Sequence, residues 1–143
     1  MKFRILWSLF CVFAIILPAL AQSDAHQTTL DGKWEAKVMI QGVEEVIHFE
    51  FKGGDGVIGG TVTEGSALPL EINNGRLVGI KLNFDTRLPP QDGNTMVMAW
   101  AGTLSSSGDS LLFVRTVEDT SSRGVAQQFE AKRMPPVHQL SSH

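Results

Sequence analysis

Cysteine is almost absent from this sequence. The 143 residues contain one, Cys11, and it lies inside an apolar segment near the N-terminus. A chain that loses this segment has no thiol and cannot form a disulfide. An exported domain without disulfides must be stabilised by its hydrophobic core alone.

The sequence also lacks a run of basic residues. It carries 12 Lys and Arg against 15 Asp and Glu, which gives a formal net charge of −3. Loss of Lys2 and Arg4 with the N-terminal segment takes this charge to about −5. Nucleic acids and anionic membrane surfaces select clustered Lys and Arg. We therefore expect neither of them as a partner.

No motif of a hydrolase or of a metal site is present. No serine stands in a Gly-x-Ser-x-Gly frame, and no nucleophile–base or acid–base pair has a recognisable spacing. His48 and Glu50 share one face of a predicted strand, but a metal site usually needs three or four ligands. A solvated outer face is the simpler interpretation of this pair. We expect no enzyme activity, no catalytic residue, no metal and no cofactor.

Helical periodicity is missing as well, and strand periodicity takes its place. From Trp34 to Ile40 apolar residues alternate with mostly charged ones, which puts the apolar set on one face of a strand. Gly32 allows a tight turn just before the indole. Trp34 is interpreted as core, and a ring at the floor of a ligand pocket is compatible with that position.

The N-terminus has the pattern of a secretory signal peptide. Lys2 and Arg4 precede an apolar run over 5–17, and Pro18-Ala19-Leu20-Ala21 supplies small residues for cleavage after Ala21. The alternative, a retained membrane anchor, needs a run of about 20 apolar residues, which is longer than this one. We expect a secreted or periplasmic protein with no membrane span after cleavage.

Short alternating segments follow one another at close spacing, as in a β-meander. We expect a flexible lead-in over 22–30, one β-domain over 31–135 and a disordered tail over 136–143. The predicted strands are 32–40, 44–52, 57–63, a segment around 68–72, 76–84, 95–104, 110–117 and 125–133.

Two glycine-containing segments give the sharpest local predictions. Asn73-Asn74-Gly75 is the strongest hairpin signal, because Asn-Gly suits a type I′ turn. Gly59-Gly60 inside a strand predicts a bend or a bulge that curls the sheet.

An antiparallel meander of about eight strands can close into a small barrel, which removes exposed strand edges. A barrel of this size has an interior that side chains just fill or that holds one small ligand. A membrane barrel is excluded, because Lys33, Glu35 and Lys37 would face lipid.

Gly32-Lys33-Trp34 at the start of the first strand resembles the Gly-x-Trp signature of the calycin superfamily, which includes lipocalins, fatty-acid-binding proteins and avidins. The chain also resembles small exported bacterial β-barrel domains of unassigned function. The resemblance implies a barrel in which a basic residue of the last strand, Lys132 or Arg133 here, packs across the tryptophan. The chain lacks the lipocalin disulfide, so the fold carries over and the ligand does not.

Two functions from different classes follow. The first is a binding module whose barrel admits a small apolar or acidic ligand. The second is a structural or interaction domain with a filled core that acts through its surface. The candidate ligand-binding residues of the first hypothesis are Trp34, Phe49, Phe51, Met96, Met98, Trp100 and Arg115.

Arg115 is the most informative of these candidates. It shares a strand face with Leu111 and Phe113, and an outward arginine is the preferred expectation. If that face is inward, Arg115 is either ion-paired or the anchor of an acidic ligand.

Overall fold

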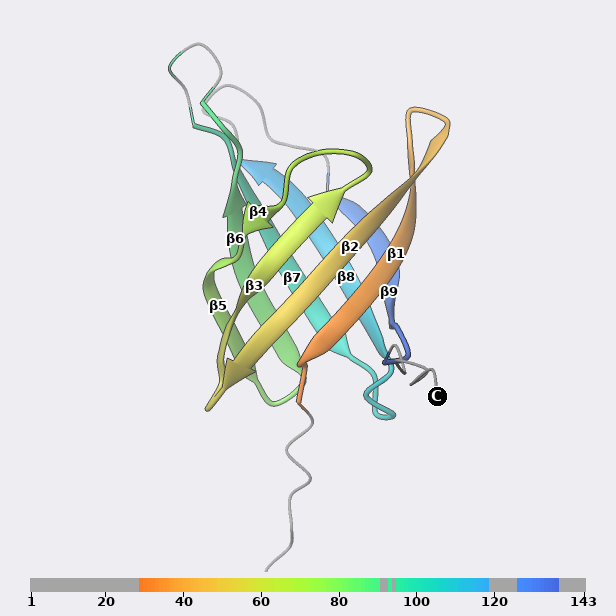
Figure 1. Cartoon of the computed structure of the whole chain (residues 1–143), viewed down its shortest axis with the longest axis vertical. Helices are drawn as coiled ribbons and strands as arrows, with labels where there is room; N and C mark the ends of the chain where they lie inside the picture. The colour runs from red at the N-terminus through yellow and green to blue at the C-terminus, as the bar shows by residue number, and fades with distance from the viewer. Residues whose placement is uncertain (1–28, 91–92, 94, 119–125, 137–143) are drawn as a thin grey trace, which may run out of the picture.

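The computed structural model describes residues 29–90, 93, 95–118 and 126–136. The predicted signal peptide, most of the lead-in and nearly all of the tail lie outside the described residues. Within the described ranges the chain forms strands and turns and no helix (Figure 1). Those ranges accordingly hold no helix of the length and apolarity that a bilayer crossing requires.

The strands form a closed antiparallel barrel. Their order is β2-β1-β9-β8-β7-β6-β5-β3, and pairing of β2 with β3 closes the ring. The two-residue β4 pairs only with β3, so eight longer strands make up the wall. The strands are β1 Gly32–Ile40, β2 Val43–Gly54, β3 Val57–Glu64, β4 Leu70–Glu71, β5 Asn73–Val78, β6 Lys81–Arg87, β7 Val97–Leu104, β8 Ser110–Glu118 and β9 Gln127–Arg133.

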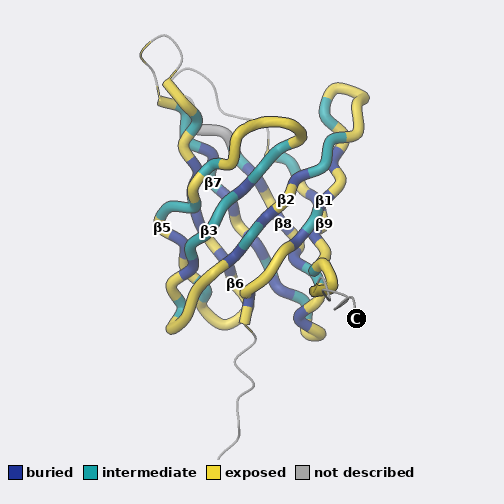
Figure 2. Tube along the Cα trace, viewed as in Figure 1, coloured by how far each residue is buried: buried dark blue, intermediate teal, exposed yellow. Residues whose placement is uncertain are grey.

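This confirms the predicted all-β meander. The first three and last three predicted strands match the observed ones to within about two residues at each end. Burial alternates along the strands as the period of two requires, so that inward positions are buried and outward ones exposed (Figure 2).

The predicted hairpin at Asn73-Asn74-Gly75 is wrong. These residues open β5, and the register between β5 and β6 shifts between Asn73 and Arg76. Asn74 does adopt the left-handed conformation, with φ of 53°, but it serves a bulge within a strand instead of a chain reversal. The reversal comes later, at Gly79-Ile80, which divides the predicted strand 76–84 into β5 and β6.

Gly60 marks the position where β3 changes partner. Before Gly60 in the chain, Ile58 pairs with β5. After Gly60, Thr61 pairs with β4. The β2–β3 register continues unbroken through Gly59 and Gly60, so this pairing contains no bulge. Gly60 has φ of 125°, and a Cβ atom there would lie 1.8 Å from the Glu50 carbonyl oxygen. Only glycine fits such a position.

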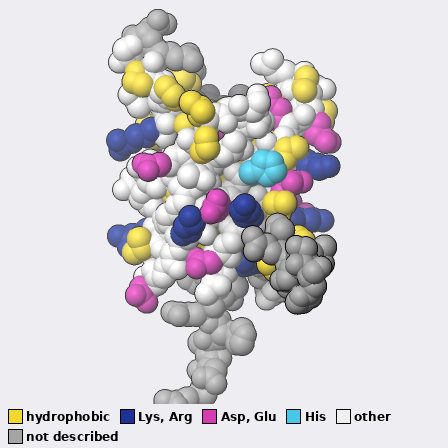
Figure 3. Space-filling model, viewed as in Figure 1, with side chains coloured by type: hydrophobic (Ala, Val, Ile, Leu, Met, Phe, Trp, Pro, Cys, Tyr) yellow, Lys and Arg dark blue, Asp and Glu magenta, His cyan; other side chains and the backbone are white. Residues whose placement is uncertain are grey.

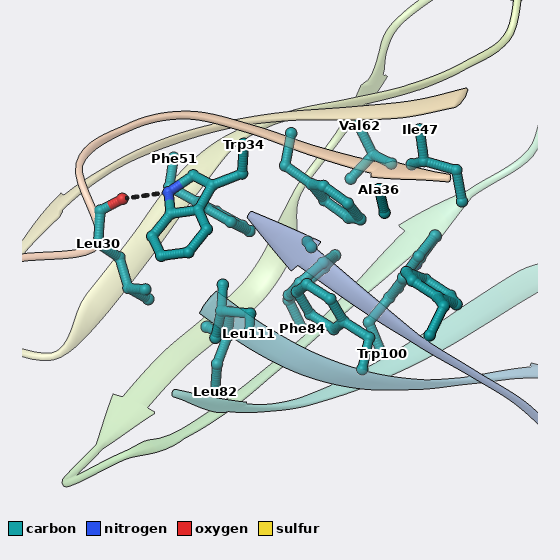
Figure 4. Close-up of a cluster of buried hydrophobic side chains, with 14 of the residues drawn as sticks. Leu30, Trp34, Ala36, Ile47, Phe51, Val62, Leu82, Phe84, Trp100 and Leu111 are labelled. Carbon is teal, nitrogen blue, oxygen red and sulfur yellow. Dashed lines mark hydrogen bonds between the residues drawn. The ribbon is translucent and has the colours of Figure 1, made fainter. Parts of the chain in front are cut away.

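Aromatic rings from six strands fill the barrel. Phe49 stacks on Phe113 with 4.9 Å between ring centroids and meets the edge of Trp100 at 5.6 Å. Phe84 stacks on Trp100 at 5.5 Å and meets Phe51 at 5.9 Å. Figure 4 shows Trp34, Phe84 and Trp100 pointing toward a common interior from different strands. These rings form one continuous core with the buried aliphatic side chains.

The end of the barrel where β1 begins is closed by Trp34. Its indole nitrogen donates a hydrogen bond to the Leu30 carbonyl at 3.0 Å (Figure 4), and both side chains are fully buried. The Arg133 guanidinium lies over the indole, 4.4 Å from the ring centroid. It also donates to the carbonyls of Asp31 and Thr29, at 2.7 Å each. Arg133 therefore ties β9 to the chain that enters β1, while Lys132 is exposed.

The two adjacent glycines of β3 allow a matched test of this packing. We expect Gly60→Ala to lower the free energy of unfolding by roughly 2–4 kcal/mol, because an L-residue at this φ is strained and its Cβ meets backbone. Gly59→Ala should cost less than about 1 kcal/mol, since a Cβ there makes only an ordinary 3.8 Å contact. Urea denaturation of both variants measures the difference, and equal losses would contradict this account of β3.

Candidate functional site

The upper end of the barrel, opposite Trp34, contains the charged group that is most deeply buried in the described chain. Alternation along β8 puts Leu111, Phe113 and Arg115 on the inner face, and Arg115 is only 9% exposed. The expectation of an outward Arg115 is therefore wrong. A buried guanidinium is tolerated when it is paired and hydrogen-bonded. The partners of Arg115 come from the neighbouring strands β7 and β9 and, for Glu64, from β3, 51 residues away in the chain.

Arg115 is held by three contacts. Its Nη1 donates to Glu64 Oε2 at 2.7 Å, and its Nη2 donates to Gln127 Oε1 at 2.6 Å. The guanidinium carbon lies 5.4 Å from the ring centroid of Trp100. The cation thus has an aromatic ring on its face and oxygen acceptors at its edge, the arrangement that suits arginine better than lysine.

The ion pair spans the width of the barrel. Three strands separate β8 from β3 in either direction around the ring, so Arg115 and Glu64 belong to opposite walls. Their side chains are 10% and 21% exposed. Glu64 Oε1 is buried without a hydrogen-bond partner among the described residues. The pair therefore bridges the barrel just above the aromatic core and leaves one carboxylate oxygen unused.

The structure brings most of the predicted ligand-binding residues together, but as neighbours in the core. Phe49, Phe51 and Trp100 are at most 1% exposed, and each contacts another aromatic ring of the interior. Trp34 contacts Phe51 edge to face at 6.4 Å. Met98 is buried in the same cluster. Met96, outside β7, is half-buried.

A second feature lies on the outside of the wall, where β1 meets β9. These two strands pair only at Trp34, Glu35 and Ala36, opposite Arg133, Lys132 and Ala131. Beyond this point the β1–β2 hairpin projects past the barrel wall (Figure 1). A groove of about 860 Å³ lies along the junction. It is lined by Glu35, Lys37, Val38, Met39, Gln127, Gln128, Phe129, Glu130, Lys132, Arg133, Met134 and Pro135.

The outward face of β2 holds the His48 and Glu50 pair. His48 Nδ1 lies 3.8 Å from Glu35 Oε2, and Glu50 pairs with Lys52 at 3.2 Å. No group of three or more potential metal ligands occurs within the residues that the structure covers. Glu50 thus forms a surface ion pair with Lys52, and His48 lies beside the Glu35 carboxylate on the same surface.

Sequence reasoning missed Glu64 and Gln127. The predicted strand 57–63 ends one residue before Glu64, although Glu64 continues the inward alternation of Ile58 and Val62. Gln127 continues the inward alternation of Phe129 in the same way. Extending the predicted strand 57–63 by one residue would have found Glu64, whereas Gln127 already lies within the predicted strand 125–133 and only its contact with Arg115 was missed. The groove gave no sequence signal, because it arises from where pairing stops.

No protein-family model, curated protein or solved structure matches the chain. Any statement about function therefore rests on the geometry and chemistry of these residues.

The cross-barrel ion pair can be tested by a double-mutant cycle. Arg115→Met should lower the free energy of unfolding by roughly 2–4 kcal/mol, because it leaves the largely buried Glu64 carboxylate without its cation. The double variant Arg115→Met/Glu64→Leu should recover part of this loss, since no unpaired charge remains.

The exposed pair of Lys37 and Glu44, 3.8 Å apart, is the matched control. Removing that pair should change stability by less than about 1 kcal/mol. Guanidinium denaturation of each variant gives the coupling energy. Strict additivity of the Arg115 and Glu64 substitutions would show that the pair contributes no coupling.

Proposed function

We propose that this chain is an exported, non-catalytic β-barrel domain that binds another protein through its outer surface. The supporting observation is the occupied interior, where aromatic rings contact one another along the whole barrel. A barrel of eight strands has room for side chains or for one small ligand, and here large side chains take that room. The interior then serves as a rigid support for the wall.

Both ends of the barrel support the same proposal. Trp34 and Leu30 close one end under the Arg133 guanidinium. The Arg115–Glu64 pair crosses the other end above Trp100. A ligand that enters from either end must displace an arginine from its partners, and at the Arg115 end that arginine is buried.

The outer wall offers features of a binding surface. Figure 3 shows a face on which acidic and basic side chains interleave, with apolar side chains between them. Met39 and Val43, at the tip of the β1–β2 hairpin, are 60% and 61% exposed. Exposed apolar side chains beside a groove are typical of sites for protein partners.

We propose that the barrel is calycin-like. The support is the Gly32-Lys33-Trp34 opening together with Arg133, which packs across the indole from the last strand. Export to the periplasm or the extracellular medium is supported by the signal-peptide pattern of residues 1–21.

A second candidate function is binding of a small acidic lipophilic ligand. Arg115 favours it, as a cation beside an aromatic core at one end of the barrel. A carboxylate ligand would have to replace Glu64 on the guanidinium and displace aromatic side chains to make room for its apolar part. That cost makes the surface function the better supported one.

Engineered cavities distinguish these functions. Dodecanoate and benzene at saturation should leave the Tm and the tryptophan fluorescence of the unmodified protein unchanged, because its interior is occupied. Phe113→Ala should lower the free energy of unfolding by about 3–5 kcal/mol and open a dry cavity. Benzene should then raise the Tm of this variant.

Phe113→Leu serves as the milder variant if Phe113→Ala does not fold. One pair of results would contradict the surface function. Dodecanoate that raises the Tm of the unmodified protein, with the effect lost in Arg115→Met, would establish the ligand-binding function and refute the surface function.

A further inference from the structure

We propose that the groove between β1 and β9 binds an extended segment of a partner polypeptide, which adds a strand to the barrel wall. This inference rests on the proposed surface function and specifies its site and ligand class. The β1–β9 register ends at Ala36 and Ala131. Beyond it, Lys37–Ile40 pairs only with β2, and 127–130 pairs only with β8.

The backbone groups of both strand ends point into the groove. On β1 the Lys33 carbonyl accepts a hydrogen bond from the Met134 amide, so odd-numbered residues of β1 turn their backbone groups toward β9. By the same alternation, the backbone of Met39 faces the groove. On β9 the Arg133 amide donates to β8, so even-numbered residues, Gln128 among them, face the groove.

A side-chain amide already occupies part of this edge. Gln127 Nε2 donates to the Met39 carbonyl at 3.2 Å, where the amide of an added strand would donate. The other end of the same amide accepts from Arg115. A primary amide has the same donor and acceptor chemistry as a peptide group. The groove therefore already binds, through a single contact, the type of group that an extended polypeptide turns toward one edge at every second residue.

The walls of the groove specify the side chains of the segment. Val38 and Phe129 form its floor on the core side. Met39 and Met134 stand at its rim, 60% and 37% exposed, and methionine adapts to varied apolar partners. Side chains alternate between the two faces of a strand, so we expect apolar residues at every second position of the bound segment.

The charge and length of the groove fit a short neutral segment. Glu35 and Glu130 are matched by Lys37 and Lys132 along the walls, and the third cation, Arg133, is engaged with Trp34 and with backbone carbonyls. This balance favours no strongly charged ligand. The unpaired edge Lys37–Ile40 is about 13 Å long at about 3.4 Å per residue. It can therefore pair with four or five residues of an extended chain.

Proline substitutions test the backbone edges, and alanine substitutions at the same positions account for the loss of the side chains. Gln128→Pro and Met39→Pro each delete an amide that faces the groove, while the amides that face β8 and β2 remain. Gln128→Ala and Met39→Ala keep the amide and truncate the side chain, and they are the matched controls. Circular dichroism and thermal melts show whether each variant is folded.

The ligand probe is a library of random heptapeptides displayed on phage, selected on the immobilised chain without residues 1–21. We expect enrichment of sequences with apolar residues at alternate positions. Synthetic copies should bind in fluorescence anisotropy, and methylation of their groove-facing amides should weaken binding by at least about tenfold. Gln128→Pro should produce a similar loss, and Gln128→Ala a change of less than about threefold.

The outcomes separate the groove from the surface function. If the peptides bind both proline variants as tightly as the unmodified protein, the groove is not their binding site. The surface function would then be at another place on the wall. If no peptide is enriched and dodecanoate binds to the interior, both the groove proposal and the surface function are overturned. A concentration-dependent dimer in light scattering that Met39→Pro abolishes would assign the groove to a second copy of this chain and refute the peptide partner. If the proline variants unfold, the methylated peptides alone decide.

Discussion

An arginine lying on an indole closes each end of this barrel, and the rest of the structure depends on that arrangement. Arg133 covers Trp34 at one end, and Arg115 covers Trp100 at the other, at 4.4 and 5.4 Å from the ring centroids. A guanidinium can present its planar face to a ring while its edge donates to oxygen acceptors. Each arginine thus meets the aromatic core with one surface and satisfies its charge with the other. A closed sheet without disulfides can be sealed in this way without an unpaired buried charge.

Because the interior is sealed, the proposed binding is expected at the outer wall of the barrel. Phe49, Trp100 and Phe113 interlock across the barrel, and close-packed rings resist any change of volume. The packing of the interior does not constrain the outward side chains of the wall. These side chains can therefore vary from one strand to another. The first and last strands join through only three residue pairs, and no described strand continues this junction, whereas β4 continues the two-pair junction of β3 and β5. The β1–β9 closure and the groove beside it therefore have the same structural origin.

Much of this fold could be predicted from sequence, because it follows from local alternation. The period of two predicted a strand over 32–40, which are the observed ends of β1. It also identified Trp34, Phe49 and Trp100 as inward residues. The Asn73-Asn74-Gly75 prediction failed because a left-handed Asn serves a bulge as well as a hairpin, and only the neighbouring strand decides between them.

The candidate sites were less predictable, because they depend on contacts between distant strands. Arg115 was expected to point outward, because no carboxylate near it in the sequence was recognised as its partner. The actual partner, Glu64, is 51 residues away in the chain. The groove was not predictable at all. Alternation says which face of a strand is buried, but not where two strands stop pairing.

The incomplete junction also differs from an exposed sheet edge, which would pair with any strand and promote aggregation. Lys37 and Glu130, which would form the next pair of the β1–β9 ladder, both carry charges. Charges at an edge discourage indiscriminate strand addition. A strand that enters here must pair between two walls and place its side chains against Val38 and Phe129. Because it would join β1 to β9 beyond their three-pair ladder, its binding would also stabilise the closure of the barrel, by an amount that grows with the logarithm of its concentration.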